Sequence, residues 1–152
     1  MLHLSGQILS QLAKDVALIP GAGAAGGLGA GLIGFLDAKL MKGFDMVAEM
    51  VELEEQIRNA DLVITGEGKI DSQTQYGKTP YGVGLLAKKY HKPAIAVAGI
   101  IESGAEVLLN YGIHAFYPIS TGHMTIDESI LRAEELLEIT GEKIARTLSI
   151  PL

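Results

Sequence analysis

The sequence predicts an α/β protein built on a three-stranded parallel sheet, with a helical, glycine-rich segment before it. Short apolar runs at residues 62–65, 94–98 and 115–119 have the length and β-branched content of buried strands. Each run precedes a helical pattern, and the returns at residues 91–93 and 112–113 are short. Such a succession forms parallel strands joined by right-handed crossovers.

The segment before the first strand is predicted to be mainly helical. Residues 6–14 repeat apolar side chains at helical spacing, and a glycine-rich loop over residues 20–31 leads into a second helix that starts near Gly26 or Gly27. A third helix starts at Asp45 and has acidic residues on the face predicted to be solvated. The positions of this third helix predicted to lie in the core are Met46, Met50, Leu53 and Ile57.

The remaining helices alternate with the strands. The first, at residues 79–90, carries Pro80 in its first turn and an apolar stripe. The second covers residues 105–111. The last helix begins with a capping box formed by Thr125 and Glu128. Its predicted core stripe consists of Ile126, Ile130, Ala133, Leu137, Ile144 and Leu148.

Loops that follow the strands should meet at one edge of this sheet, because parallel strands all end on the same side. These loops cover residues 66–77, 99–104 and 120–125. Polar side chains gather in them: Glu67, Lys69, Asp71, Ser72, Gln73, Thr74, Lys78, Glu102, Ser103, Thr121 and His123. This edge is therefore the predicted ligand-binding edge.

Composition excludes several classes of function. The net charge of −6 argues against a nucleic-acid partner, and the absence of cysteine excludes disulfides, thiolate metal sites and a thiol nucleophile. Residues 16–36 carry no charge, but so many are glycine or alanine that membrane insertion would have little driving force. We expect a cytoplasmic protein without a membrane span, since the start of the chain lacks a signal-peptide pattern.

Two glycine motifs could bind phosphate groups. Gly21, Gly23 and Gly26 match the dinucleotide fingerprint, with Asp45 near the expected distance beyond it, although Pro20 interrupts the approach. A lone match of this kind is weak evidence for NAD binding. A glycine loop before a helix can nonetheless hold a phosphate or carboxylate through its N–H groups.

The second motif is Gly77-Lys78-Thr79, which resembles the end of a P-loop. Ser72 occupies the position where a P-loop needs its first glycine, so a P-loop fold is rejected. Lys78 at a helix start can still hold an anionic phosphate.

Two carboxylates precede Lys78. Glu67 and Asp71 could together bind Mg²⁺, and one of them could accept the proton of an attacking hydroxyl. Asp71 could instead be a turn or cap residue.

The stretches PGAGAAGGLGAGL and DLVITGEGKIDSQTQYGKTP together resemble the bacterial type-1 glycerate kinase family. The resemblance implies ATP-dependent phosphorylation of a hydroxyl of D-glycerate, with ATP and Mg²⁺ bound between two α/β domains. Family members are longer, so this chain matches their C-terminal portion. Residues 59–152 would form the C-terminal half of a Rossmann-like domain, and residues 1–58 the end of a second, cleft-forming domain.

The resemblance covers the motifs, and the roles of individual residues within them are our own inference. We predict catalytic roles for Glu67, Asp71 and Lys78, with Glu67 and Asp71 also as metal ligands. The predicted cofactor-binding residues are Gly21, Gly23, Gly26, Gly27, Gly66, Gly68, Gly77 and Thr79. A chain without the N-terminal portion of the enzyme should be inactive alone. The alternative is a non-catalytic α/β module that binds a nucleotide or a carboxylate, and self-association into a homo-oligomer stays open.

Overall fold

The computed structural model describes residues 2–120, 122 and 124–150. The chain divides into two compact units, Met1–Gly43 and Phe44–Leu152. Each unit is described by itself below. Thr121 and His123, predicted at the ligand-binding edge, lie outside the described residues.

The first unit contains two helices, α1 (Leu2–Leu12) and α2 (Ala24–Leu36). They pack through a small core that includes Ile8 and Ala30. A Cβ atom added to Gly34 would lie 2.7 Å from a methyl group of Ile8, so close helix packing requires this glycine. Lys14 closes the unit by donating a hydrogen bond to the carbonyl of Gly34 and by pairing with Asp37 at 2.6 Å.

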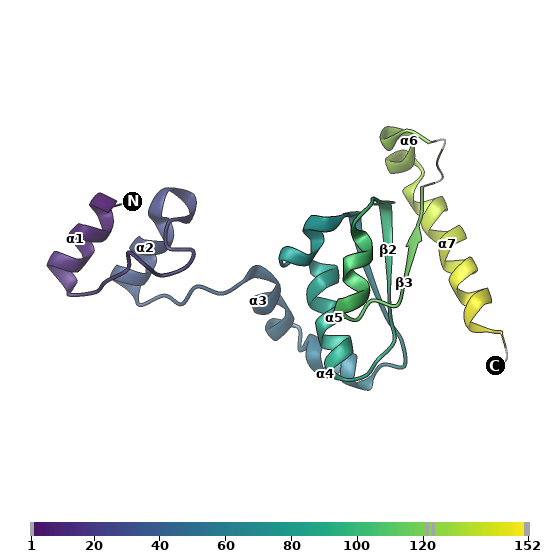
Figure 1. Ribbon diagram of the computed structural model, residues 1–152, viewed down its shortest axis with the longest axis horizontal. Coiled ribbons are helices and arrows are strands. Elements are labelled where there is room, and N and C mark those ends of the chain that lie inside the picture. The colour runs from purple at the N-terminus through teal and green to yellow at the C-terminus, as the bar shows by residue number, and fades with distance from the viewer. Residues whose placement is uncertain (1, 121, 123, 151–152) are drawn as a thin grey trace. The chain divides into compact units, whose positions relative to one another are not determined.

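The second unit is built on a parallel sheet of three strands in the order β1-β2-β3 (Figure 1). The strands are β1 (Val63–Ile70), β2 (Ala94–Ile101) and β3 (Ala115–Pro118). Val63 of β1 pairs with Ala94 of β2, and this register continues as far as Ile70 and Ile101. The predicted α/β class and the parallel sheet are therefore confirmed.

Helices surround this sheet in the order expected from the sequence. They are α3 (Gly43–Met50), α4 (Leu53–Asn59), α5 (Thr79–Lys89), α6 (Ile126–Leu131) and α7 (Ala133–Leu148), with 3₁₀-helices η1 (Ser72–Tyr76) and η2 (Ala105–Tyr111). Two predicted helices are each divided. Glu52 adopts a left-handed conformation between α3 and α4, and the last helix breaks at Arg132.

A hydrophobic core lies where α4, α5 and η2 pack against the sheet. Ile57 of α4, Val83 and Ala87 of α5 and Leu108 of η2 are all buried in it. Phe44 packs against this core as well, and the second compact unit begins at this residue. Whether residues 1–58 belong to another domain of a longer enzyme stays a prediction.

Two predicted apolar stripes are largely exposed. Met46 and Met50 of α3 are solvent-accessible, Met50 to 77%, so their assignment to the core is wrong. Leu136, Thr140 and Ile144 of α7 are buried, whereas four of the six positions predicted for the last helix, now divided into α6 and α7, are exposed. Those four are Ile126, Ile130, Leu137 and Leu148. Among the described residues, no helix is long and apolar enough to cross a membrane.

Candidate active site

The first strand continues further than its sequence suggests. Gly66, Glu67 and Gly68 belong to β1, so the predicted loop over residues 66–77 is wrong in its first half. The backbone of this segment pairs with β2, and Glu67 lies opposite Ala98. Four residues of strand separate the Cα atoms of Glu67 and Asp71 by about 13 Å. The expectation that both carboxylates share one Mg²⁺ ion stays a prediction, since it requires both side chains to reach a common point from this separation.

Asp71 stands directly after β1 and caps the helix η1. Its Oδ1 atom accepts hydrogen bonds from the Gln73 N–H at 2.9 Å and from the Thr74 hydroxyl at 3.4 Å. The Thr74 hydroxyl in turn accepts the Asp71 N–H at 3.1 Å. Thr74 is fully buried, so this capping box fixes the carboxylate from the protein side.

Two lysines flank the Asp71 carboxylate. The Nζ atom of Lys69 is 3.7 Å from Oδ2, and that of Lys78 is 3.8 Å from Oδ1. Burial raises the pKa of Asp71, but the Gln73 N–H, the two ammonium groups and the Thr74 hydroxyl together outweigh it and lower the pKa overall. The carboxylate is therefore ionised at neutral pH and is a weak base.

Glu102 joins this cluster from the neighbouring strand. It follows β2 as Asp71 follows β1, and its Oε2 atom lies 2.9 Å from the Lys69 Nζ atom. The hydrogen bond with Glu102 is the main reason why the pKa of Lys69 is raised. The sequence placed both residues at this edge but did not predict their pairing, which depends on the strand register.

The turn into α5 positions Lys78. Gly77 adopts φ +105°, a left-handed conformation that glycine reaches without strain. Lys78 then occupies the N-cap position, followed by Thr79 and Pro80 in the first turn. The predicted start of this helix is confirmed, and it brings Lys78 to the same carboxylate as Lys69.

Glycines let the strand ends approach one another closely. A Cβ atom on Gly99 would lie 2.5 Å from the Gly68 carbonyl oxygen. A Cβ atom on Gly104, whose φ is +88°, would lie 2.8 Å from the Ser72 Cβ atom. These contacts join the segments that carry Asp71 and Glu102, so the cluster depends on both glycines.

The glycine motif of the first unit has an irregular backbone. Ala25, Gly26 and Gly27 have left-handed φ values, and Gly21 has φ +87°. Residues 13–16 are irregular and residues 17–23 form turns, so no strand precedes Gly21 in this segment. The dinucleotide fingerprint, which needs a strand before its first glycine, therefore lacks its structural context. Gly21, Gly23, Gly26 and Gly27 belong to the first compact unit, and their role at the site stays a prediction.

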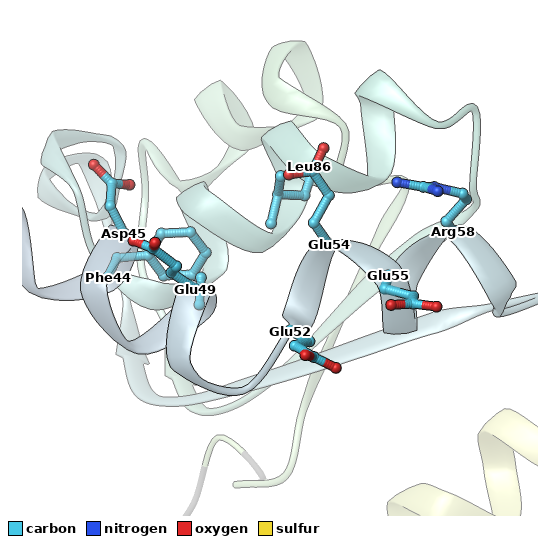
Figure 2. A pocket seen from close by; sticks show the side chains of 9 residues that line it. Phe44, Asp45, Glu49, Glu52, Glu54, Glu55, Arg58 and Leu86 are labelled. Atoms are coloured by element: carbon cyan, nitrogen blue, oxygen red, sulfur yellow. The ribbon is translucent and has the colours of Figure 1, made fainter.

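An acidic hollow of about 530 Å³ lies beside α3 and α4. Figure 2 shows Glu52, Glu54 and Glu55 pointing in different directions, and Glu54 binds Lys89 and Tyr90. In the part of the chain that the structure describes, no three acidic or imidazole side chains are grouped to hold a metal ion. The hollow is accordingly a solvated acidic surface. For Mg²⁺ the described residues offer Asp71, which fits the usual arrangement of one or two carboxylates completed by phosphate oxygens.

Comparisons with known proteins identify relatives over most of the chain. The model of the glycerate kinase family matches residues 1–149. A glycerate kinase of Halalkalibacterium halodurans is 49% identical over 95% of this chain and 38% of its own length. The glycerate 2-kinase of Escherichia coli is 45% identical over 97% of this chain and 39% of its own length.

A solved structure agrees with these relatives. A crystal structure from Salmonella typhimurium LT2, assigned provisionally as glycerate kinase 2, is 38% identical and gives a TM-score of 0.78. The similarity covers 97% of this chain and 37% of that one. The chain thus spans less than two fifths of the length of these relatives.

Proposed function

This chain belongs to the glycerate kinase family, and from that premise we propose that it is the C-terminal part of a kinase acting on D-glycerate. The enzyme would transfer the γ-phosphoryl group of ATP to a hydroxyl of the sugar acid. The observation that carries the proposal is the arrangement of Asp71 between two lysines at the ends of parallel strands, where ligands of α/β proteins bind.

Each residue of the cluster has a role that its surroundings support. Lys78, at the start of α5, would bind phosphate oxygens together with the N–H groups of that helix, to which Thr79 belongs. Gly77 would let the backbone turn close to the phosphates. Asp71 would hold Mg²⁺ with those phosphates, and Gly66, Glu67 and Gly68 would line the cleft along β1.

The reaction needs positioning and charge neutralisation more than a strong base. The glycerate hydroxyl oxygen attacks the γ-phosphorus, the bond to the β,γ-bridging oxygen breaks, and ADP leaves while the hydroxyl proton is released. Mg²⁺, when bound, neutralises charge on the transferred group. The lowered pKa of Asp71 favours an electrostatic role over that of a general base.

The chain would work only with the N-terminal portion of the enzyme. Within the described residues, no strand pairs with the outer edge of β1, and Ile64 on this strand is 56% exposed. Unpaired edges and exposed apolar side chains of this kind are usually covered by further structure. We propose that the N-terminal portion completes a Rossmann-like sheet there, and that the enzyme acts in the cytoplasm on ATP.

An assay of ATP-dependent glycerate phosphorylation tests this proposal. The chain alone should show no turnover, and adding the N-terminal portion of a glycerate kinase should restore it. Robust turnover by the isolated chain would contradict the need for the other portion. Nucleotide binding that never leads to turnover, even in the completed enzyme, would favour the non-catalytic module instead.

A further inference from the structure

Lys69 lies between carboxylates that end two neighbouring strands. Ile70 pairs with Ile101, so the residues that follow them, Asp71 and Glu102, emerge side by side. The Lys69 Nζ atom is 2.9 Å from the Glu102 Oε2 atom but 3.7 Å from the Asp71 Oδ2 atom. Glu102 is thus the residue that holds this lysine.

The geometry leaves Lys69 able to bind a ligand. An ammonium group has three N–H donors, and a separation of 3.7 Å is too long for a hydrogen bond. The contact with Glu102 therefore leaves donors directed away from it, and the Lys69 side chain is 47% exposed to solvent. Lys78 approaches the opposite oxygen of Asp71, so that two ammonium groups flank one fixed carboxylate.

We propose that Lys69 is a second cationic residue that binds an anionic group of the substrates, a phosphate or a carboxylate, and that Glu102 is its positioning residue. The inference rests on the proposed function and adds residues to the same site. A lysine side chain is flexible, and fixing it before the ligand arrives reduces the entropy lost on binding. Glu102 thus acts through Lys69 rather than on the ligand.

Whether replacing Glu102 weakens or tightens ligand binding distinguishes a positioning role of this residue from simple charge repulsion. Removing a carboxylate near a bound polyanion should tighten binding if only Coulomb repulsion matters. If Glu102 positions Lys69, then Glu102→Gln should instead weaken binding. The same change should have no further effect once Lys69 is replaced by methionine, because the group through which Glu102 acts is gone.

Calorimetric titration measures these effects on the chain alone and on the chain combined with the N-terminal portion of a glycerate kinase. Mg²⁺-ATP, tripolyphosphate and D-glycerate serve as separate probes, which distinguishes a phosphate from a carboxylate as the bound group. The variants are Lys69→Met, Glu102→Gln and the double variant, with Lys69→Arg and Lys78→Met for comparison. Lys89→Met is the matched control, because Lys89, in the last turn of α5, forms a similar ion pair with Glu54 of α4.

We expect Lys69→Met to weaken binding of one probe about tenfold and Glu102→Gln to weaken it about threefold, as for the loss of hydrogen bonds to charged groups. Lys89→Met should bind as the wild type does. Thermal unfolding checks that each variant folds, and Lys69→Arg, which keeps the charge, should retain most of the affinity.

Two results would overturn the inference alone. These are tighter binding by Glu102→Gln, or wild-type affinity in Lys69→Met when Lys78→Met has lost binding. The second result would leave the proposed function standing. If the wild-type chain binds none of the probes, either alone or combined with the N-terminal portion of a glycerate kinase, both proposals are overturned.

Discussion

At the scale of single residues, the chemistry of the site depends on how Asp71 is held. Hydrogen bonds from Gln73 and Thr74 fix one oxygen, and Lys69 and Lys78 approach the carboxylate from two sides. Asp71 is only 17% exposed. The sequence left a capping role and a functional role open, and the structure shows that the capping geometry itself presents the carboxylate to both lysines.

Acid should weaken this arrangement. The pKa of Asp71 is lower in the folded chain than its usual value of about 3.9, so the stabilisation it provides is complete above that value. It is lost as the pH falls through the folded-state pKa. We expect the stability difference between the wild type and Asp71→Asn to stay constant from about pH 7 to about pH 5 and to shrink as the pH falls below about 4, measured by urea unfolding. A difference that stays constant with pH would contradict the assigned shift.

Local patterns predicted some of these residues and not others. Pro80 in a first helical turn and the glycine before Lys78 are signals within a few residues, and the structure confirms the helix start that they indicate. The contact between Lys69 and Glu102 joins residues far apart in sequence. Only the pairing of β1 with β2 brings them together. The register of that pairing cannot be read from a local sequence pattern.

At the scale of elements, β1 shows how pairing overrides local propensity. Its last five residues contain two glycines and two charged residues, a composition typical of a loop. Hydrogen bonding to β2 nevertheless makes it a strand. Gly99 on β2 permits this, because any side chain there would meet the backbone of Gly68.

Alanine at Gly99 should therefore be much more destabilising than alanine at Gly68. A Cβ atom at Gly99 would lie 2.5 Å from a backbone oxygen, whereas one at Gly68 meets no atom within 4 Å. We expect Gly99→Ala to reduce the free energy of unfolding by about 1–3 kcal/mol, as for overpacked sites. Gly68→Ala should change it by less than about 0.5 kcal/mol. Chemical denaturation measures both, and equal losses would refute the assigned contact.

Apolar periodicity predicted helices better than it predicted burial. The pattern correctly indicated α3, α4 and α7, but Met50 and Leu137 are at least half exposed. A stripe shows which face of a helix is apolar, not whether another element covers it. In α5, by contrast, Val83 and Ala87 are buried because the sheet lies against that face.

At the scale of the whole molecule, the chain corresponds to less than two fifths of its relatives. The motifs that resemble glycerate kinases predicted the family from sequence, and the alternation of short apolar runs with helical patterns predicted the α/β class. The division at residue 43 was not predictable, because it depends on tertiary contacts, among them the packing of Phe44 against the second core.

The open side of the sheet offers a test of completion by the N-terminal portion. Ile64 is 56% exposed on β1 and borders a hollow lined by Leu137 and Thr140 of α7, so Ile64→Asp should lower the free energy of unfolding of the chain by about 0.5–1 kcal/mol. It should weaken association with the N-terminal portion about tenfold or more, as for a buried charge at an interface. Met50→Asp, on the exposed face of α3, is the control. Analytical ultracentrifugation measures the association of each variant with the N-terminal portion. Equal affinities for Ile64→Asp and Met50→Asp would place the contact elsewhere.

The most direct test is the kcat/KM for glycerate phosphorylation by the completed enzyme carrying Asp71→Asn. Asp61→Asn is its matched control, since Asp61 is exposed just before the same strand. We predict a loss of at least about 100-fold for Asp71→Asn, typical of removing a group that stabilises transition-state charge, and none for Asp61→Asn. A folded Asp71→Asn enzyme that keeps wild-type activity would show that phosphoryl transfer takes place away from this edge of the sheet.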